Sequence, residues 1–161
     1  MRLDSQSRPS THVVTRELAD ELLHSSGKLI LRAAGRSMVP TIWPGDTLVV
    51  EPIGESSLQR GDIVLFSTKK RFVAHRVIAK AKNRGPVTTC GDASLKPDAP
   101  VRQGDLLGKV AFVIRNGKCM QPARTLSGSQ RAFASLLRRS ETAARVIVGI
   151  HGFGRTSKPT I

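Results

Sequence analysis

The sequence predicts a mainly β fold: a coiled antiparallel or barrel-like sheet, with a short helix before it and a basic helix after it. Three observations support this prediction. Short runs of β-branched residues recur after Gly27, separated by Gly, Pro and Asp. Apolar residues before Gly27 follow helical spacing, and the composition becomes basic and helix-forming after Met120. The 161 residues suit one domain with tails, and the expected divisions are 1–28, 29–120 and 121–161.

The N-terminal segment predicts one short amphipathic helix. Residues 1 to 12 are polar and are expected to be disordered. Thr15 can cap a helix that Gly27 ends, and an apolar face is formed by Leu18, Leu22 and Leu23. One such helix is too little for a helix-turn-helix DNA-binding unit.

Five later segments have the composition of β-strands: Lys28–Ala33, Asp46–Pro52, Asp62–Phe66, Phe72–Ile78 and Leu107–Ile114. Their close spacing predicts mainly antiparallel pairing. A Gly-Asp pair stands at the start of two of them, at residues 45–46 and 61–62, and a third pair shortly precedes another strand. Such pairs are typical of turns, so these positions are expected to be strand connections.

Residues 128 to 150 predict a basic helix. Between residues 115 and 158 the chain carries nine Lys or Arg residues and a single acid, Glu141. The apolar residues of this helix are Phe133, Leu136, Leu137, Val146 and Ile147. They could lie on anionic lipid as a peripheral membrane contact, or pack against the sheet and leave the basic face in solvent. The second arrangement needs no partner and is favoured.

The composition restricts the classes of partner and site. A net charge of +14 predicts an anionic partner, but Tyr is absent and aromatic residues are 4% of the chain, which disfavours nucleic acid. Cys90 and Cys119 lack CxxC spacing and a histidine cluster, so free thiols, no metal and no cofactor are expected. No apolar run approaches the roughly 20 residues of a spanning helix, and no secretory signal is apparent. We therefore expect a cytoplasmic protein.

The stretch AGRSMVPTIWPGD, residues 34–46, contains the first candidate site residue. A serine attacks an amide only if a base removes its proton and hydrogen-bond donors stabilise the oxyanion that forms. Gly35 leaves space for a substrate carbonyl, Met38 can anchor the turn in the core, and Pro40 stiffens it. The same composition also suits an ordinary turn, so the stretch alone does not assign a role to Ser37.

A histidine and two aspartates follow in two later segments. His75 lies in the predicted strand FVAHRVI, and Asp92 and Asp98 lie in TTCGDASLKPDAPV. With Ser37 they can form a triad, in which serine attacks, histidine accepts the proton and a carboxylate orients the imidazole. A lone strand histidine is more often structural, and most chains of this length contain these residue types. The residue types alone therefore leave both interpretations open.

Four ordered sequence boxes between about residues 29 and 114 are more specific. GRSMVPTIWPGDTLVV is similar to the pattern G-x-S-M-x-P-T-[IL] followed by G-D-x-[LV], and QRGDIVLF to R-G-D-[IV]-V-x-[FL]. VAHRVI stands where relatives carry a Lys-Arg or His-Arg pair, and TCGDASLKPDAPV is similar to T-x-G-D-x-N-x-x-x-D-x-x-P-V. The chain thus resembles signal peptidase I-like serine peptidases of the S24/S26 group, in the histidine-type branch of the endoplasmic reticulum and archaea. Their catalytic domain is shared with self-cleaving LexA-type repressors.

The resemblance implies a role for each matching residue. Ser37 is implied as the nucleophile, with its own backbone N–H as one oxyanion donor. His75 is implied as the general base, and Asp98 as the carboxylate that orients it. Asp92 matches an aspartate that supports the site.

Two features depart from the family pattern. Many relatives supply a second oxyanion donor from a serine two positions before the nucleophile, where this chain has Gly35. A backbone group or Arg36 is then left to serve as that donor. Relatives also carry a spanning helix that places the active site at a membrane surface, and no such helix is apparent in this sequence.

We predict a serine endopeptidase that acts on a peptide or preprotein substrate, cutting an extended leader or signal-like segment after a small residue. Two alternatives are a LexA-like self-cleaving regulator and a non-catalytic peptide-binding module. The first is disfavoured by the short N-terminal region, by His75 in place of a lysine, and by an Ala34–Gly35 bond too close to Ser37. The second is disfavoured by the complete set of triad residues, although Gly35 leaves it open.

Overall fold

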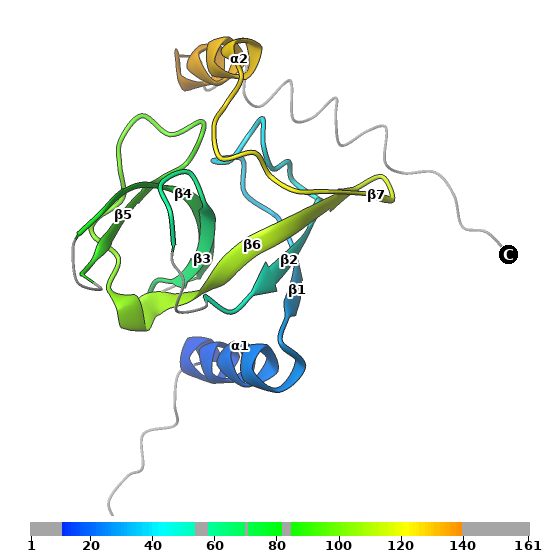
Figure 1. The fold of residues 1–161 in the computed structure, drawn as a ribbon, viewed down its shortest axis with the longest axis vertical. Helices are drawn as coiled ribbons and strands as arrows, with labels where there is room; N and C mark the ends of the chain where they lie inside the picture. The colour runs from blue at the N-terminus through cyan, green and yellow to red at the C-terminus, as the bar shows by residue number, and fades with distance from the viewer. Residues whose placement is uncertain (1–10, 54–57, 70, 82–84, 140–161) are drawn as a thin grey trace, which may run out of the picture.

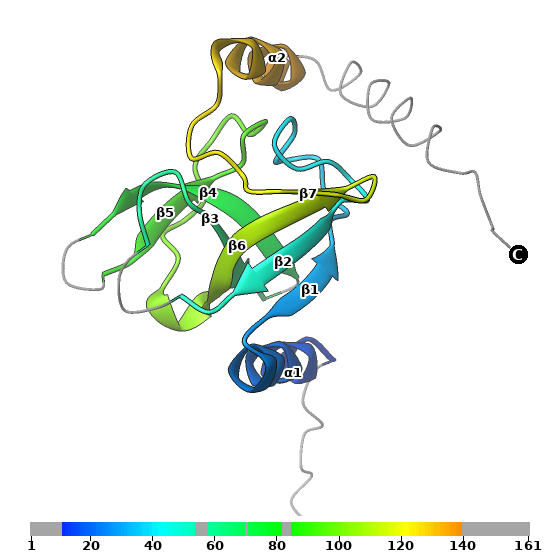
Figure 2. The same ribbon diagram turned by 45° about the vertical axis from the view of Figure 1, so that its right-hand side comes forward.

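The computed structural model describes residues 11–53, 58–69, 71–81 and 85–139. One antiparallel sheet forms its body, and a helix lies at either end of the sheet (Figures 1 and 2). The helices are α1 (Thr11–Ser26) and α2 (Gly128–Arg139), and a 3-10 turn covers Gln103–Asp105. The strands are β1 (Leu29–Arg32), β2 (Thr47–Glu51), β3 (Ile63–Ser67), β4 (Phe72–Lys80), β5 (Val87–Cys90), β6 (Leu106–Arg115) and β7 (Lys118–Met120).

The strands form the order β1-β2-β6-β3-β4-β5, with β7 paired to β6, and every pairing is antiparallel. The predicted mainly β, antiparallel fold is confirmed, although the sheet is open and does not close into a barrel. Register shifts interrupt three of the ladders, in the β2–β6, β3–β6 and β4–β5 pairs. Such irregularities increase the local twist, so they favour a coiled sheet over a flat one.

All five predicted strands are present, with ends within two residues of those expected. Strands β5 and β7 were not predicted. β5 has four residues, two of them threonines, and the three residues of β7 are all exposed, so neither has a strong apolar pattern. Both are ordered by pairing with long neighbours, β4 and β6, which is a tertiary effect that local composition does not contain.

Helix α1 differs from the prediction at its start and in its buried face. It begins at Thr11, so Thr15 is not its cap and the predicted disorder of residues 11 and 12 is wrong; residues 1 to 10 lie outside the described chain. A cap contributes only about 1 kcal/mol, which does not prevent a helix from extending past it. Ala19 and Leu23 face the core, one helical turn apart, whereas Leu18 and Leu22 are exposed. Gly27 ends the helix with a positive φ of 68°, as expected.

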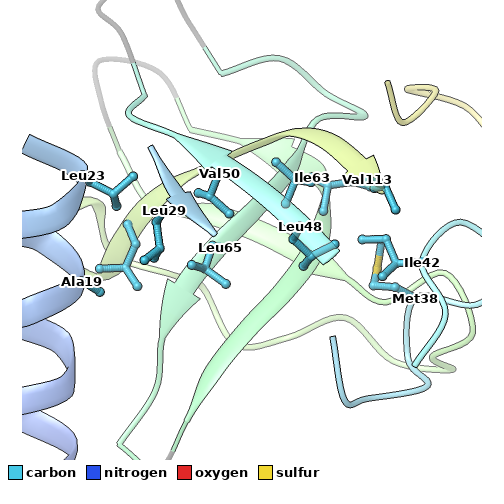
Figure 3. Close-up of a cluster of buried hydrophobic side chains, with 12 residues drawn as sticks. Ala19, Leu23, Leu29, Met38, Ile42, Leu48, Val50, Ile63, Leu65 and Val113 are labelled. Atoms are coloured by element: carbon cyan, nitrogen blue, oxygen red, sulfur yellow. The ribbon is translucent and has the colours of Figure 1, made fainter. Parts of the chain in front are cut away.

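The main hydrophobic cluster lies between α1 and the nucleophile loop, which we define as residues 33–46 (Figure 3). It joins Ala19 and Leu23 of α1 to apolar residues of β1, β2, β3 and β6. At the far end it includes Met38 and Ile42 of the nucleophile loop. The loop is therefore held by burial of its own side chains, each of which contributes about 1.5–3 kcal/mol when fully buried.

A second cluster packs on the other face of β3. Ile63 and Leu65 of that strand belong to the main cluster, whereas Val64 and Phe66 belong to the second. Strand β3 is consequently buried along its whole length. Its neighbour β4 contributes Val77 to the second cluster, and His75 lies between Val77 and Val73 on the same face. The backbone of His75 therefore belongs to a well-packed strand, from which its side chain extends to the site.

The predicted Gly-Asp turns before β2 and β3 share one arrangement. In each, the glycine has a positive φ, and the aspartate carboxylate accepts a hydrogen bond from the backbone N–H three residues earlier: Trp43 to Asp46 at 2.7 Å and Gln59 to Asp62 at 2.9 Å. Both carboxylates are buried and paired with an arginine, Arg115 and Arg124 respectively. Each turn is thus held by a hydrogen bond inside the turn and by an ion pair with an arginine from a later part of the chain.

Helix α2 confirms the first half of the predicted basic helix, and residues 140–150 lie outside the described chain. Ser127 and Gln130 form a reciprocal capping box at its start. Ala134 and Leu137 are buried and Leu136 is 55% exposed, so this part of the helix packs one apolar side on the protein. It does so at the end of the sheet where the loops after β1 and β5 gather (Figures 1 and 2). Neither described helix has the length and apolar character needed to cross a bilayer.

Candidate active site

The nucleophile loop holds Ser37 on the protein surface through a compact turn. Val39 N–H donates to Arg36 O at 3.2 Å, and Ile42 N–H donates to Met38 O at 2.9 Å. Because Met38 and Ile42 are buried in the main cluster, the turn is anchored immediately after the serine. Ser37 itself is half-buried. The predicted anchoring role of Met38 is confirmed.

His75 approaches the serine from the middle of β4. Its backbone is directly opposite Val64 of β3, and its ring lies edge-on to Phe66 with the ring centres 6.2 Å apart. Its side chain is only 10% exposed. A packed strand on one side and an aromatic ring on the other restrict the imidazole to few orientations.

The structure brings together the three residues of the predicted triad, from three separate segments. His75 Nε2 lies 2.8 Å from Ser37 Oγ, and His75 Nδ1 lies 2.6 Å from Asp98 Oδ2. An ionised carboxylate can only accept, so Nδ1 carries the proton in this arrangement and Nε2 is left to accept from the serine hydroxyl. This is the tautomer that a general base needs.

Asp98 is held by a residue to which sequence reasoning gave no role. Thr89 Oγ1 donates to Asp98 Oδ2 at 2.7 Å, and Asp98 N–H donates to Thr89 O at 2.8 Å. Thr89 is completely buried at the end of β5. It is the threonine of the quoted box TCGDASLKPDAPV, so its position within that box was the available signal.

Asp92, expected to support the site, lies in a buried network with Arg76. The guanidinium donates to both carboxylate oxygens, from Nε and Nη2, at 2.8 Å each. Nη2 also donates to Thr41 Oγ1, and Thr41 Oγ1 in turn donates to Asp92. Nη1 donates to Gly61 O and Ala123 O, both at 2.8 Å. All five N–H donors of the arginine are thereby satisfied, which a buried guanidinium requires.

This network ties the nucleophile loop to the rest of the site. Thr41 belongs to the loop, Arg76 to β4 next to His75, and Asp92 to the segment that leads to Asp98. The contribution of Asp92 is therefore positional, and Thr41 and Arg76 share it. Arg76 and Thr41 both stand in quoted boxes, VAHRVI and GRSMVPTIWPGDTLVV, but neither box indicated a contact with Asp92.

A close backbone approach also connects the segment after β5 to the serine. Ala93 N–H donates to Ser37 O at 2.8 Å. A Cβ added at Gly91 would lie 2.6 Å from Ser37 O and 2.9 Å from Ser37 Cβ, closer than real Cβ atoms approach. Glycine is therefore required at position 91, and its place in the predicted site was not recognised from the sequence.

Gly35 and Arg36 are both exposed beside the serine. A Cβ at Gly35 would lie 4.0 Å from Ser37 Oγ, an ordinary contact distance. The space expected to admit a substrate carbonyl beside Gly35 is thus open to a side chain as well. The oxyanion roles of Arg36 and of the Ser37 backbone N–H stay predictions.

Cys90, at the end of β5, places a thiol near the site. Burial raises the pKa of Cys90, and the carboxylates of Asp98 and Asp92 raise it further against the opposing charge of Arg138. This favours the neutral thiol. In the part of the chain that the structure describes, no three His, Cys, Asp or Glu side chains gather in a way that could hold a metal ion.

The geometry supports nucleophilic attack by an activated hydroxyl. A serine in contact with a correctly protonated histidine, itself oriented by a carboxylate, is the arrangement used for acyl transfer to water. Residues 6–85 match the family model Peptidase S24-like. The match supports a peptidase fold of the S24/S26 type, and with it hydrolase chemistry. No curated protein matches the chain.

The S24-like segment contains only part of the triad. It includes Ser37 and His75 and ends before Asp92 and Asp98. The two aspartates come from the following residues, which the fold returns to the serine through β5. The assignment of Asp98 accordingly rests on the sequence box and on its distance from His75.

Proposed function

We propose that the protein is a serine endopeptidase that cleaves extended leader or signal-like peptides, with the mechanism of the histidine-type signal peptidase branch. The observation that carries the proposal is the hydrogen-bonded series from Ser37 through His75 to Asp98. A turn serine with a structural role has no need of a histidine and a carboxylate aligned behind it.

In this mechanism Ser37 Oγ attacks the carbonyl carbon of the scissile bond as His75 Nε2 takes the hydroxyl proton. Asp98 stabilises the resulting imidazolium through its bond to Nδ1. His75 then gives the proton to the leaving amine, and an acyl-enzyme forms on Ser37. Water repeats the sequence with His75 as base, which releases the new carboxyl end and restores the serine.

The edge of the sheet supports an extended mode of substrate binding. Strand β1 pairs with β2 on one side, and it is one of the two terminal strands in the order of the described sheet. The chain passes from β1 directly into the nucleophile loop, and Ile30 on this strand is 59% exposed. A peptide added to β1 would gain backbone hydrogen bonds and be led towards Ser37.

The direct test is cleavage of synthetic leader-like peptides, followed by mass spectrometry of the products. We expect kcat/KM to fall by at least about 1,000-fold in both Ser37→Ala and His75→Ala, because the two side chains act as one unit. Cleavage that survives in both purified, folded variants would exclude the proposed mechanism.

A self-cleaving regulator is the second candidate, because the S24-like match of residues 6–85 suggests a peptidase-fold family that includes LexA-like self-cleaving proteins. The intact mass of the purified protein, followed over time with Ser37→Ala as the control, separates the two. Loss of mass that depends on Ser37, without turnover of added peptides, would favour self-cleavage. Turnover of added peptides by a chain of constant mass favours the endopeptidase.

A further inference from the structure

One concave feature of the protein is lined by none of the three triad residues. It is a groove of about 650 Å³ between the turn at Gly61, the neighbouring parts of β4 and β5, and the chain from Arg124 into α2. The walls are closely joined: a Cβ at Gly61 would lie 2.5 Å from the backbone oxygen of Arg124. Arg138 Nη2 also donates to Asp92 O at 2.6 Å and ties α2 to the opposite wall. The groove is thus formed by packed segments.

Four exposed arginines line this groove, which we call the arginine groove: Arg60, Arg124, Arg131 and Arg138. Three of them are held in place by bonds to the protein: Arg124 to Asp62 at 2.9 Å, Arg131 to Leu126 O at 3.1 Å, and Arg138 to Asp92 O. Their guanidinium groups are therefore oriented before any ligand arrives. Preorganised arginines bind carboxylates with a smaller loss of side-chain entropy.

The charge of the groove is positive after its own acids are considered. Asp92 is the one carboxylate among the residues that line it, and Asp62, which pairs with the lining residue Arg124, lies outside that lining; both carboxylates are buried. Asp92 is paired with Arg76, and Asp62 with Arg124 and Lys109. Clustered cations in a concave surface concentrate the electrostatic potential and attract anionic groups.

The arginine groove borders the triad at β4. Arg76 and Val77, which follow His75 in this strand, line the groove, whereas none of the three triad residues does. Gly91 is the point of closest approach, since it lines the groove and also packs against Ser37. A ligand in the groove would consequently leave the serine accessible.

The shape and composition of the groove favour a polypeptide as its ligand. The residues that line it include no aromatic side chain, so the stacking surfaces typical of single-stranded nucleic-acid sites are absent from it. It is concave, whereas a bilayer surface requires a protruding or flat basic face. Arginine pairs with carboxylates in a bidentate geometry, and several arginines along one groove suit consecutive Asp or Glu residues.

We propose that the arginine groove binds an acidic segment of the peptide or precursor that the active site cleaves. The proposal rests on the proposed function for the identity of the ligand, but binding at the groove does not require catalysis. Such a segment would raise the local concentration of the scissile region at Ser37, as linked binding sites do.

The first experiment measures binding alone. A fluorescein-labelled oligo-glutamate peptide is titrated with the Ser37→Ala protein at low salt, and anisotropy is recorded. Replacing two groove residues together, Arg60→Gln and Arg131→Gln, should weaken binding about tenfold. A matched pair that removes the same charge from exposed positions outside the groove, Arg102→Gln and Lys118→Gln, should change it by no more than about twofold.

Equal weakening by both pairs would show attraction to net charge only and would overturn the proposal. It would also be overturned if phosphatidylserine vesicles or an oligothymidylate bound more tightly than the peptide and lost that binding in the groove variant alone. Peptide binding that is lost in the groove variant alone, without such competition, supports the acidic polypeptide.

The second experiment tests the link to cleavage. Two leader-like peptides are compared on the active protein, one extended with glutamates and the other with glutamines. The glutamate extension should lower KM several-fold, and the ratio of the two KM values should return to about one in the groove variant. Because binding is measured on an inactive protein, failure of the endopeptidase function and failure of the groove proposal give different results. A KM ratio that is unchanged in the groove variant would contradict the link.

Discussion

Thr89 Oγ1 donates a 2.7 Å hydrogen bond to Asp98 Oδ2, the same carboxylate oxygen that receives His75 Nδ1. The threonine therefore fixes the carboxylate that fixes the base. We expect Thr89→Val to reduce kcat about tenfold with little change in KM, because one hydrogen bond to a charged group is lost while the volume is nearly kept. Steady-state kinetics on a leader-like peptide would measure kcat and KM separately.

The control for this prediction is Thr89→Ser, which keeps the hydroxyl and should restore most of kcat. Thermal unfolding of both variants should show similar midpoints. If the serine variant were as impaired as the valine variant, the hydroxyl would not be the group that matters, and the positioning role of Thr89 would be wrong.

The two glycines beside Ser37 predict opposite outcomes for the same substitution. Gly91→Ala should destabilise the site and sharply lower activity, since its Cβ would lie 2.6 Å from Ser37 O. Gly35→Ala has no such contact and should be tolerated. Gly35→Ser should raise kcat above that of Gly35→Ala if its hydroxyl reaches the oxyanion. Equal kcat values for the alanine and serine variants at position 35 would remove that position from the oxyanion hole.

Cys90 offers a probe of the triad that does not depend on cleavage. Burial and the charge of Asp98 both raise the pKa of its thiol. In a Cys119→Ser background, Asp98→Asn should therefore lower that pKa and speed alkylation by iodoacetamide about threefold at fixed pH. Glu17→Gln, on α1 at the opposite end of the sheet, is the control and should leave the rate unchanged (Figure 1). A slower reaction after Asp98→Asn would contradict the arrangement.

Asp62 predicts how stability depends on acid. Burial alone would raise the pKa of Asp62, but the bonds from Gln59 N–H and Arg124 and the charge of Lys109 outweigh it, so the pKa lies below its ordinary 3.8. A lowered folded-state pKa gives stability that is present above pH 3.8 and is lost as the pH falls through the folded value.

We expect Asp62→Asn to lower the free energy of unfolding at pH 7 by about 2 kcal/mol, and with it the urea midpoint. The difference in unfolding free energy between wild type and variant should shrink as the pH falls below 3.8. Circular dichroism of urea unfolding at several pH values would measure this. Asp105→Asn, whose half-exposed carboxylate pairs with Arg16 at 3.3 Å, serves as the control with a small effect. A difference between wild type and Asp62→Asn that stayed constant with pH would contradict the assignment.

The parts of the fold that local composition specifies were predictable, and those that depend on partners were not. Apolar runs bounded by Gly-Asp turns gave five of the strands. Strand β5 escaped because its stability comes from pairing with β4, and the start of α1 was misplaced because a favourable cap such as Thr15 does not oblige a helix to begin there. The predicted domain boundaries stay predictions.

The same distinction holds for the site. Ser37, His75 and Asp98 stand in sequence boxes, and the structure brings them within hydrogen-bond distance. Contacts such as those of Thr41 with Arg76 and Asp92 join residues far apart in the chain, and no local pattern encodes them. A sequence box can identify the residues that carry the chemistry, whereas the contacts that hold those residues in place form only in the folded protein.

The five bonds of Arg76 also decide how far the chain could be shortened by protein engineering. One of them ends on Ala123 O, beyond the boundary at residue 120 that composition suggested. A chain cut at that boundary would leave a buried guanidinium hydrogen without its acceptor, at a cost of about 1–3 kcal/mol, and the loss would fall on the strand that carries the base. A minimal version of this protein would therefore have to retain the residues after β7.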